Sequence, residues 1–304
     1  MHILILGAAA GGGFPQWNAN NAQCQRARAA DPMVPPQTQS SVAVSLDGQQ
    51  WCLFNASPDL RQQINDNPQL HPRADGPVRQ SPIRSVVLTN ADVDHVAGLL
   101  NLRESQPFSL FATARVQATL RANSIFNVLN PDFVTRQETQ LDREFSPLPG
   151  LTVTAFAVPG KVALYLEDPA AEGFGTMAGD TVGLEVCETA SGRRFYYIPG
   201  CARVDDALRA RLAGAALLLF DGTLFTDEEM IVAGEGIKTG TRMGHIAMSG
   251  PEGSLAALAD IAVEQKLYIH INNTNPVLMR DSDARRQIVD AGWGIAMDGM
   301  EIRL

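Results

Sequence analysis

Short apolar runs recur along this chain, and each is closed by turn-forming residues. They are rich in β-branched and aromatic residues and have the length of β-strands. Segments with apolar residues at helical spacing lie between only some of them. Because a strict alternation of strand and helix is absent, the pattern predicts an α/β fold of two mixed sheets faced by helices. The predicted strands span residues 2–6, 40–46, 51–56, 83–89, 151–158, 181–186, 195–200, 216–222 and 267–271, and the predicted helices span 59–66, 112–122, 205–212, 252–266 and 281–291.

The segments between these predicted elements do not have the composition of a domain linker. Residues 29–38 and 67–82 are Pro-rich loops, while 123–150 and 167–180 are irregular and could cover a site. A length of 304 residues is within the range that large α/β folds reach as one unit. We therefore expect a single domain over residues 1–304.

The charge of the chain excludes some classes of partner. The net charge is −9, which argues against binding to nucleic acid or to an anionic membrane surface. No apolar stretch approaches the ~20 residues of a membrane span. The N-terminus lacks the basic region of a signal peptide, so we expect a cytoplasmic protein. The four cysteines are scattered, which is typical of thiols in a reducing compartment.

A glycine-rich run, Gly7 to Gly13, follows the first predicted strand. A dinucleotide-binding loop needs a third glycine in register and a helix that opens directly afterwards. Here Phe14, Pro15 and Gln16 follow instead. The run is better explained as a loop whose glycines let the backbone pass close to another element.

Three potential metal ligands follow the predicted strand 83–89. Asp92, Asp94 and His95 lie within four positions, and Asn90 adds a neutral oxygen. So many polar groups are costly in a partly buried place, and a divalent cation would compensate them. The alternative is a solvated turn in which an aspartate caps a helix.

Three further candidates lie at strand ends or just before a helix. His270 and Asp221 come at the ends of two apolar strands, and His245 lies in a glycine-flanked segment before a predicted helix. The ends of strands that face loops are where α/β folds build their sites. For each residue alone, a satisfied core or capping group is the alternative. His2 and His71 are expected to have no role in the site.

The order of these elements resembles the metallo-β-lactamase superfamily, whose motif is a strand followed by T-H-x-H-x-D-H-x-x-G. In this frame Asp94, His95 and Gly98 match, whereas Asn90 and Asp92 replace the two early histidines. The resemblance implies an α+β four-layer αββα sandwich, in which two mixed sheets are flanked by helices.

The C-terminal half resembles the RNA-processing and phosphodiesterase branch of that superfamily. Asp221 and His245 lie in matching places, and His270 matches the histidine that follows a late strand. However, no histidine occurs near Lys161, where a third motif should lie, and Cys201 stands where a bridging aspartate is expected. A hydrolase with two zinc ions needs more ligands than this chain offers.

Longer motifs are similar to those of the coenzyme PQQ synthesis protein B family, where PQQ is pyrroloquinoline quinone. The family resemblance covers essentially the whole chain and implies a role in maturing a PQQ precursor made from cross-linked Glu and Tyr residues of a peptide. The matching segments are residues 11–18, 39–41, 55–59, 89–100, 221–223, 243–245, 270–276 and 298–300.

Family members often carry C-x-C-x-x-C after the Trp-Asn pair, which forms a structural zinc site. Here only Cys24 of the three cysteines is present. One thiolate with neutral neighbours cannot make a closed zinc site. We therefore expect no structural zinc.

Two histidines and one carboxylate have the composition of an oxygen-activating Fe(II) site with open positions. We expect Fe(II), with Zn or Mn as alternatives, and assign His245 as a proton-transfer group or substrate anchor. The assigned ligands are His95, His270 and Asp94, with Asp92 and Asp221 as further or alternative ligands.

Three functions remain open at this point. The first is metal-dependent hydroxylation of the tyrosine ring of the Glu–Tyr precursor. The second is a non-catalytic carrier that transports PQQ or its precursor to the periplasm, and the third is a metal-dependent hydrolase. The expected partner is the precursor or PQQ itself, and a homodimer is compatible with the sequence.

Overall fold

The first of two seven-stranded sheets is built mainly from the N-terminal half. The computed structural model describes residues 1–304, apart from the side chain of Phe174. Neighbouring strands β14, β1, β2 and β3 are antiparallel, and β3 to β6 are parallel, so the sheet is mixed. In sheet order the strands are β14 (Glu301–Arg303), β1 (His2–Gly7), β2 (Ser41–Ser45), β3 (Trp51–Phe54), β4 (Ile83–Val87), β5 (Phe108–Thr113) and β6 (Val134–Thr139).

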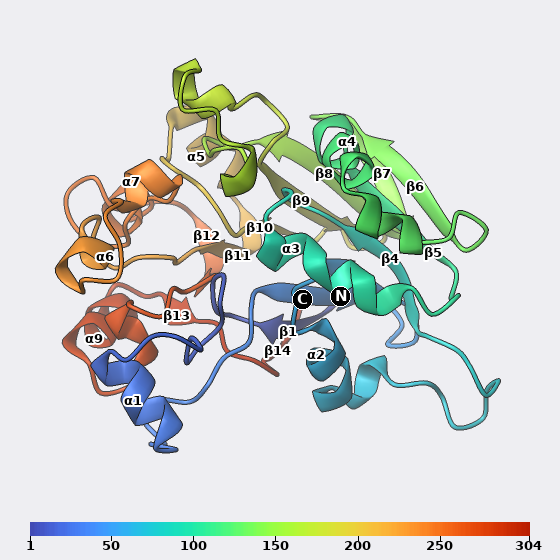
Figure 1. Cartoon of the computed structure of the whole chain (residues 1–304), viewed down its shortest axis with the longest axis horizontal. Helices are drawn as coiled ribbons and strands as arrows, with labels where there is room; N and C mark the ends of the chain where they lie inside the picture. Colours follow the sequence, from blue (N-terminus) through green and yellow to red (C-terminus); the bar gives the residue numbers. More distant parts are fainter.

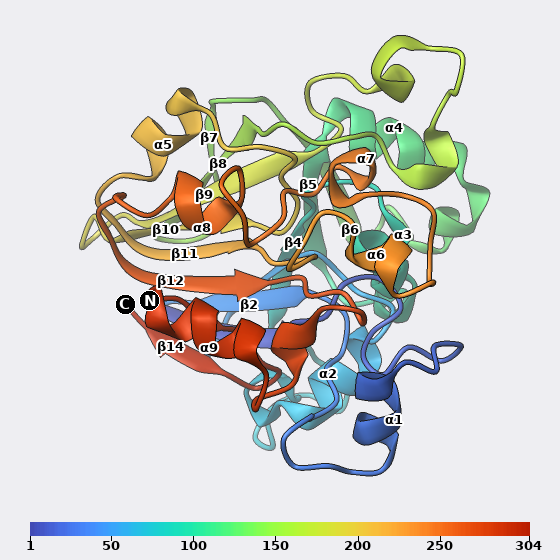
Figure 2. The same cartoon turned by 90° about the vertical axis from the view of Figure 1, so that its left-hand side faces the viewer.

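The second sheet is mixed in the same way. Strands β7 to β10 are antiparallel, and β10 to β13 are parallel. In sheet order they are β13 (Gly294–Ile295), β12 (Val263–Ile269), β11 (Ala215–Asp221), β10 (Arg194–Ile198), β9 (Val182–Glu188), β8 (Leu151–Ala157) and β7 (Glu144–Leu148). The two chain ends lie side by side, where the Met1 amino group donates to the Leu304 carbonyl at 2.8 Å (Figures 1 and 2).

The alternation of side chains along each strand separates the core into layers. In β1, Ile3 and Ile5 belong to a buried cluster shared with strands of the second sheet, while Leu4 and Leu6 belong to a cluster on the opposite face. Successive side chains of a strand point to opposite faces of a sheet, and here both faces are apolar. The strand is therefore buried throughout, as a central strand of a sandwich requires.

Helices cover the two outer faces. Helices α2 and α4 contribute to the cluster outside the first sheet, and α5 and α9 to the cluster outside the second. The predicted four-layer αββα sandwich is therefore confirmed (Figures 1 and 2). The helices are α1 (Ala22–Arg28), α2 (Leu60–Asp66), α3 (Val93–Val96), α4 (Ala114–Ala122), α5 (Asp206–Leu212), α6 (Glu229–Val232), α7 (Gly240–Met243), α8 (Ser254–Ala257) and α9 (Asp283–Asp290), with six short 3₁₀ helices.

The prediction of a helix over residues 252–266 is wrong. Helix α8 is only one turn long, and β12 begins at Val263 and pairs with β11 along its whole length. Pairing with a fully buried neighbour outweighs the helical spacing of the local sequence. Among the described residues, every helix is too short or too polar to span a lipid bilayer.

Candidate metal centre

The strands that carry the candidate ligands come from both sheets. Asp94 and His95 lie in α3, directly after β4 of the first sheet. Asp221 ends β11 and His270 follows β12 in the second sheet. The ends of these strands meet at one edge of the sandwich, which brings together residues that are up to 176 positions apart.

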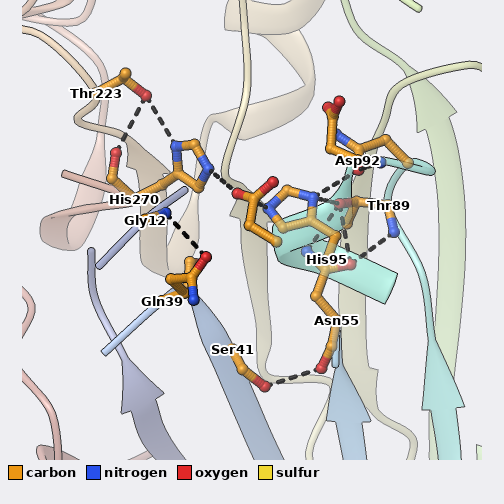
Figure 3. Close-up of polar contacts among 12 residues, drawn as sticks. Gly12, Gln39, Ser41, Asn55, Thr89, Asp92, His95, Thr223 and His270 are labelled. Atoms are coloured by element: carbon orange, nitrogen blue, oxygen red, sulfur yellow. Dashed lines mark hydrogen bonds and ion pairs between the residues drawn. The ribbon is translucent and has the colours of Figure 1, made fainter. Parts of the chain in front are cut away.

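Asp94, His95 and His270 form a first set of potential ligands. One ligand atom from each lies within 4.8 Å of the others. His270 Nε2 is 3.0 Å from Asp94 Oδ2, and His95 Nε2 is 3.6 Å from the same oxygen. Figure 3 shows His95 and His270 pointing toward one another across this position. The predicted meeting of three distant residues therefore occurs.

One buried atom shows that this set fits a metal ion. His95 Nε2 is buried and has no hydrogen-bond partner. Such an atom is costly unless a ligand satisfies it, and it points into the first set. Burial lowers the pKa of His95 to about 4, so the imidazole is neutral near pH 7 and its lone pair can coordinate.

Hydrogen bonds fix the orientation of both imidazoles. His95 Nδ1 is 2.6 Å from Asn90 Oδ1 and 3.4 Å from the Thr89 hydroxyl, which leaves Nε2 for a metal. His270 Nδ1 is 2.9 Å from the Thr223 hydroxyl. His270 has a φ of 63°, a left-handed conformation that few residues other than glycine adopt. Metal-binding histidines are commonly held in this way through their second nitrogen.

Asp94 and His270 each shift the pKa of the other. Burial would raise the pKa of Asp94, but the adjacent His95 and His270 hold it below its ordinary value. Burial would lower the pKa of His270, but the hydrogen bond and charge of Asp94 raise it. The carboxylate is therefore ionised and available to a cation.

Asp221, His245 and His270 form a second set with the same spacing. Both oxygens of the fully buried Asp221 are already engaged. Oδ1 accepts from the Thr223 amide and hydroxyl, and Oδ2 accepts from the Cys201 amide and lies 2.7 Å from His245 Nδ1. This arrangement suits a carboxylate that orients His245. The assignment of Asp221 as a ligand stays a prediction.

His245 lies against the first set without belonging to it. Its ring stacks on that of His270, with ring centres 5.4 Å apart and an angle of 18° between the planes. With Nδ1 turned to Asp221, the other nitrogen is left for a molecule in the cavity that the ring lines. That position suits the proton-transfer role predicted for it.

Asp92 lies outside both sets among the described residues. Its carboxylate accepts from the Asn90 amide at 2.9 Å and from the Leu164 backbone amide at 3.4 Å. Burial and the neighbouring Asp94 charge raise its pKa. Its assignment as a further ligand stays a prediction.

A cavity of about 520 Å³ opens onto the first set. This volume is in the range of small-molecule sites. Much of its wall is apolar, and it includes the glycine loop that we predicted to pass close to another element. A methyl group added at Gly11 would lie 3.5 Å from Asp94 Cγ. The lining side chains that the sequence did not single out for this site include Leu164, Met230, Ile237, Lys238 and Met243.

Known proteins resemble the chain both in sequence and in structure. Residues 50–271 match the model of the beta-lactamase superfamily domain. A coenzyme PQQ synthesis protein B from Methylorubrum extorquens is 55% identical over 304 residues, which cover both chains completely. The chain belongs to the coenzyme PQQ synthesis protein B family. As a member of this family, the chain is a PQQ biosynthesis protein.

The family has a solved structure that matches this chain closely. Zn(2+)-bound PqqB from Methylobacterium extorquens is 54% identical, superimposes with a TM-score of 0.96 and is covered completely, as is this chain. A diphosphatase of the PhnP family has a TM-score of 0.70 at 16% identity and covers 99% of this chain and 96% of its own. The second likeness shows the shared fold alone.

Cys24 is buried in an apolar environment. Cys24 lies in α1 with no exposed surface and packs in the cluster outside the second sheet. The N-terminus of α1 is capped by Asn21, whose oxygen accepts from the Cys24 amide at 2.8 Å. The side-chain amide of Asn21 donates to Glu235 at 2.6 Å and to Asn273 at 3.0 Å. Asn21 thus links the start of α1 to Glu235 and Asn273.

We expect Cys24→Ser to leave the metal content of the purified protein unchanged. Among the described residues, neither group of potential metal ligands includes Cys24, and one thiolate cannot complete a tetrahedral zinc site. Elemental analysis of both proteins, before and after the active-site metal is removed with a chelator, measures this. A stoichiometric zinc ion that survives chelation in the wild type and disappears in the variant would contradict the prediction.

Proposed function

We propose that this family member hydroxylates the tyrosine ring of the Glu–Tyr precursor of PQQ with one iron(II) ion held by Asp94, His95 and His270. The observation that carries the proposal is the first ligand set itself. Two imidazoles and one carboxylate converge on one side of a position whose other side faces a cavity. This composition is typical of iron sites that react with dioxygen. When bound, iron(II) supplies the redox chemistry that activates dioxygen.

The side chains around that position have separate roles in the proposal. Asp94, His95 and His270 hold the ion, and Asn90 and Thr223 orient the two imidazoles. His245, oriented by Asp221, accepts the proton of the substrate phenol. The apolar wall of the cavity excludes water from the reacting ring.

The overall reaction balances with an external reductant. One oxygen atom of dioxygen is inserted into a ring C–H bond. The other leaves as water with two electrons and two protons, which a reductant such as ascorbate supplies in the assay. The PqqB structure that carries Zn(2+) supports a divalent ion in this fold. Zinc cannot exchange electrons, and we therefore propose iron as the working metal.

Anaerobic loading with iron(II), followed by isotopically labelled dioxygen, ascorbate and a Glu–Tyr substrate, tests the proposal. We expect a ring-hydroxylated product that carries the label, and none with zinc in place of iron. Turnover with zinc under anaerobic conditions would instead identify a hydrolase. A carrier would show no turnover with either metal, would bind PQQ tightly, and would bind it as tightly after His270→Ala. A cytoplasmic location and a homodimer stay predictions.

A further inference from the structure

We propose that Lys161 and Lys238 form a carboxylate-binding anchor in the wall of the metal cavity. The anchor holds an acidic group of the substrate while its aromatic ring lies at the metal position. The identity of the substrate rests on the proposed function, whereas the binding of a carboxylate does not. The expected ligand class is an aromatic compound with two or more carboxylates.

Lysine is rare in this chain, and its distribution is uneven. Only three lysines occur among 304 residues, at positions 161, 238 and 266. Two of the three line the cavity that faces the metal ligands. In a chain with a net charge of −9, this places two of the few ammonium groups beside the metal position. An ammonium group in such a wall can pair with an anionic ligand and fix its orientation.

A single carboxylate, Glu167, gathers three cations. Its oxygens lie 2.8 Å from Lys161 Nζ and 2.9 Å from Arg242 Nη2, and 3.8 Å from Lys238 Nζ. Its side chain is only 9% exposed. The hydrogen bond from Arg242 lowers the pKa of Glu167 to about 2, so it is ionised at neutral pH. Glu167 is thus closely paired with Lys161 and Arg242, and Lys238 is the most distant of its three cations.

A second carboxylate, that of Asp92, interacts with one of the two lysines. The charge of Lys161 acts on Asp92, which lines the same cavity. Lys238 is the more loosely held of the two, at 3.8 Å from Glu167 and 34% exposed. Lys161 therefore positions Glu167 and adds positive electrostatic potential to the cavity wall. Lys238 is the residue best placed to pair with a ligand carboxylate.

Glu167 also joins two separate segments of the cavity wall. It follows the 3₁₀ helix Leu164–Leu166, whereas Lys238 and Arg242 belong to the loop before α7 and to α7. These segments lie side by side in both views (Figures 1 and 2). Leu164 and Ile237, one from each segment, line the cavity next to the lysines and offer an apolar surface for an aromatic ring.

Binding of PQQ, an aromatic tricarboxylate, to the zinc-loaded full chain tests the anchor by calorimetry. We expect Lys238→Gln to weaken PQQ binding about tenfold, which corresponds to about 1.4 kcal/mol. Lys266→Gln removes the same charge outside the cavity and is expected to leave the affinity unchanged. The trimethyl ester of PQQ should bind weakly to all three proteins, and the salt dependence of PQQ binding should be smaller for Lys238→Gln.

The anchor would be overturned if the wild type did not bind PQQ, if Lys238→Gln bound it as tightly as the wild type, or if the ester bound as well as the acid. Thermal unfolding of each variant confirms that the proteins are folded. A chain that fails to hydroxylate but binds PQQ through Lys238 contradicts the proposed function and supports the anchor. A chain that hydroxylates its substrate with an unchanged KM in Lys238→Gln supports the function and contradicts the anchor.

Discussion

Replacing His270 with alanine is expected to abolish turnover and to weaken binding of a divalent metal more than about 100-fold. Loss of a residue that only orients a ligand costs about 10- to 100-fold in affinity, and His270 is itself a proposed ligand. It is the one residue that belongs to both ligand sets. Its loss also removes one hydrogen-bond partner of the Thr223 hydroxyl and the ring on which His245 stacks.

Two further variants separate loss of the ligand from loss of the fold. Because His270 has a left-handed backbone conformation, alanine is strained there, whereas asparagine adopts it more readily. His270→Asn should therefore retain the unfolding midpoint of the metal-free wild type and still bind metal poorly. His71→Ala removes an exposed histidine of a Pro-rich loop and should bind metal normally. Calorimetric titration with iron(II) or zinc measures all four proteins, and a wild-type affinity in both His270 variants would contradict the proposed centre.

The meeting of Asp94, His95 and His270 was predictable because each follows an apolar strand. Polar residues at such places can only face the edge of the sandwich, where the strands end. The continuous apolar run at residues 2–6 similarly predicts β1, since Ile3 and Ile5 face one core and Leu4 and Leu6 the other. Local sequence was sufficient in both cases because a strand that is buried on both faces has a short, unbroken apolar run.

Long-range pairing explains what the sequence did not show. Strand β6 lies at the edge of the first sheet, and most of its side chains are exposed or half-buried, so it lacks an apolar repeat. Asn90 was expected as a neutral ligand, but its oxygen instead contacts His95 Nδ1. The association of Lys161 with Lys238 depends on two loops that only tertiary structure brings together. The rarity of lysine in the sequence could have drawn attention to both positions, but it could not show that they line the same cavity.

Gly98→Ala is expected to destabilise the chain by about 3 kcal/mol, in the upper part of the range for overpacked sites. A Cβ atom at this position would lie 2.1 Å from the Ser57 carbonyl oxygen and 2.8 Å from that of Ala56. These neighbours are backbone atoms that cannot rotate away. The Gly98 amide also donates to the Ala56 carbonyl at 2.8 Å, and the Ala56 amide donates to the His95 carbonyl at 2.8 Å. The close approach of the two segments therefore holds the turn that carries His95.

The same substitution should lower metal affinity, because the displaced segment includes two of the three proposed ligands. Urea denaturation of the metal-free proteins measures the stability, and titration with zinc measures the affinity. Ala97→Ser adds one atom at the neighbouring, half-buried position and should change stability by no more than about 0.5 kcal/mol. If Gly98→Ala were as stable as Ala97→Ser, the contact with Ser57 would not constrain the loop. If instead it lost stability but kept its metal affinity, the loop would position Asp94 and His95 independently of its packing against residues 56–57.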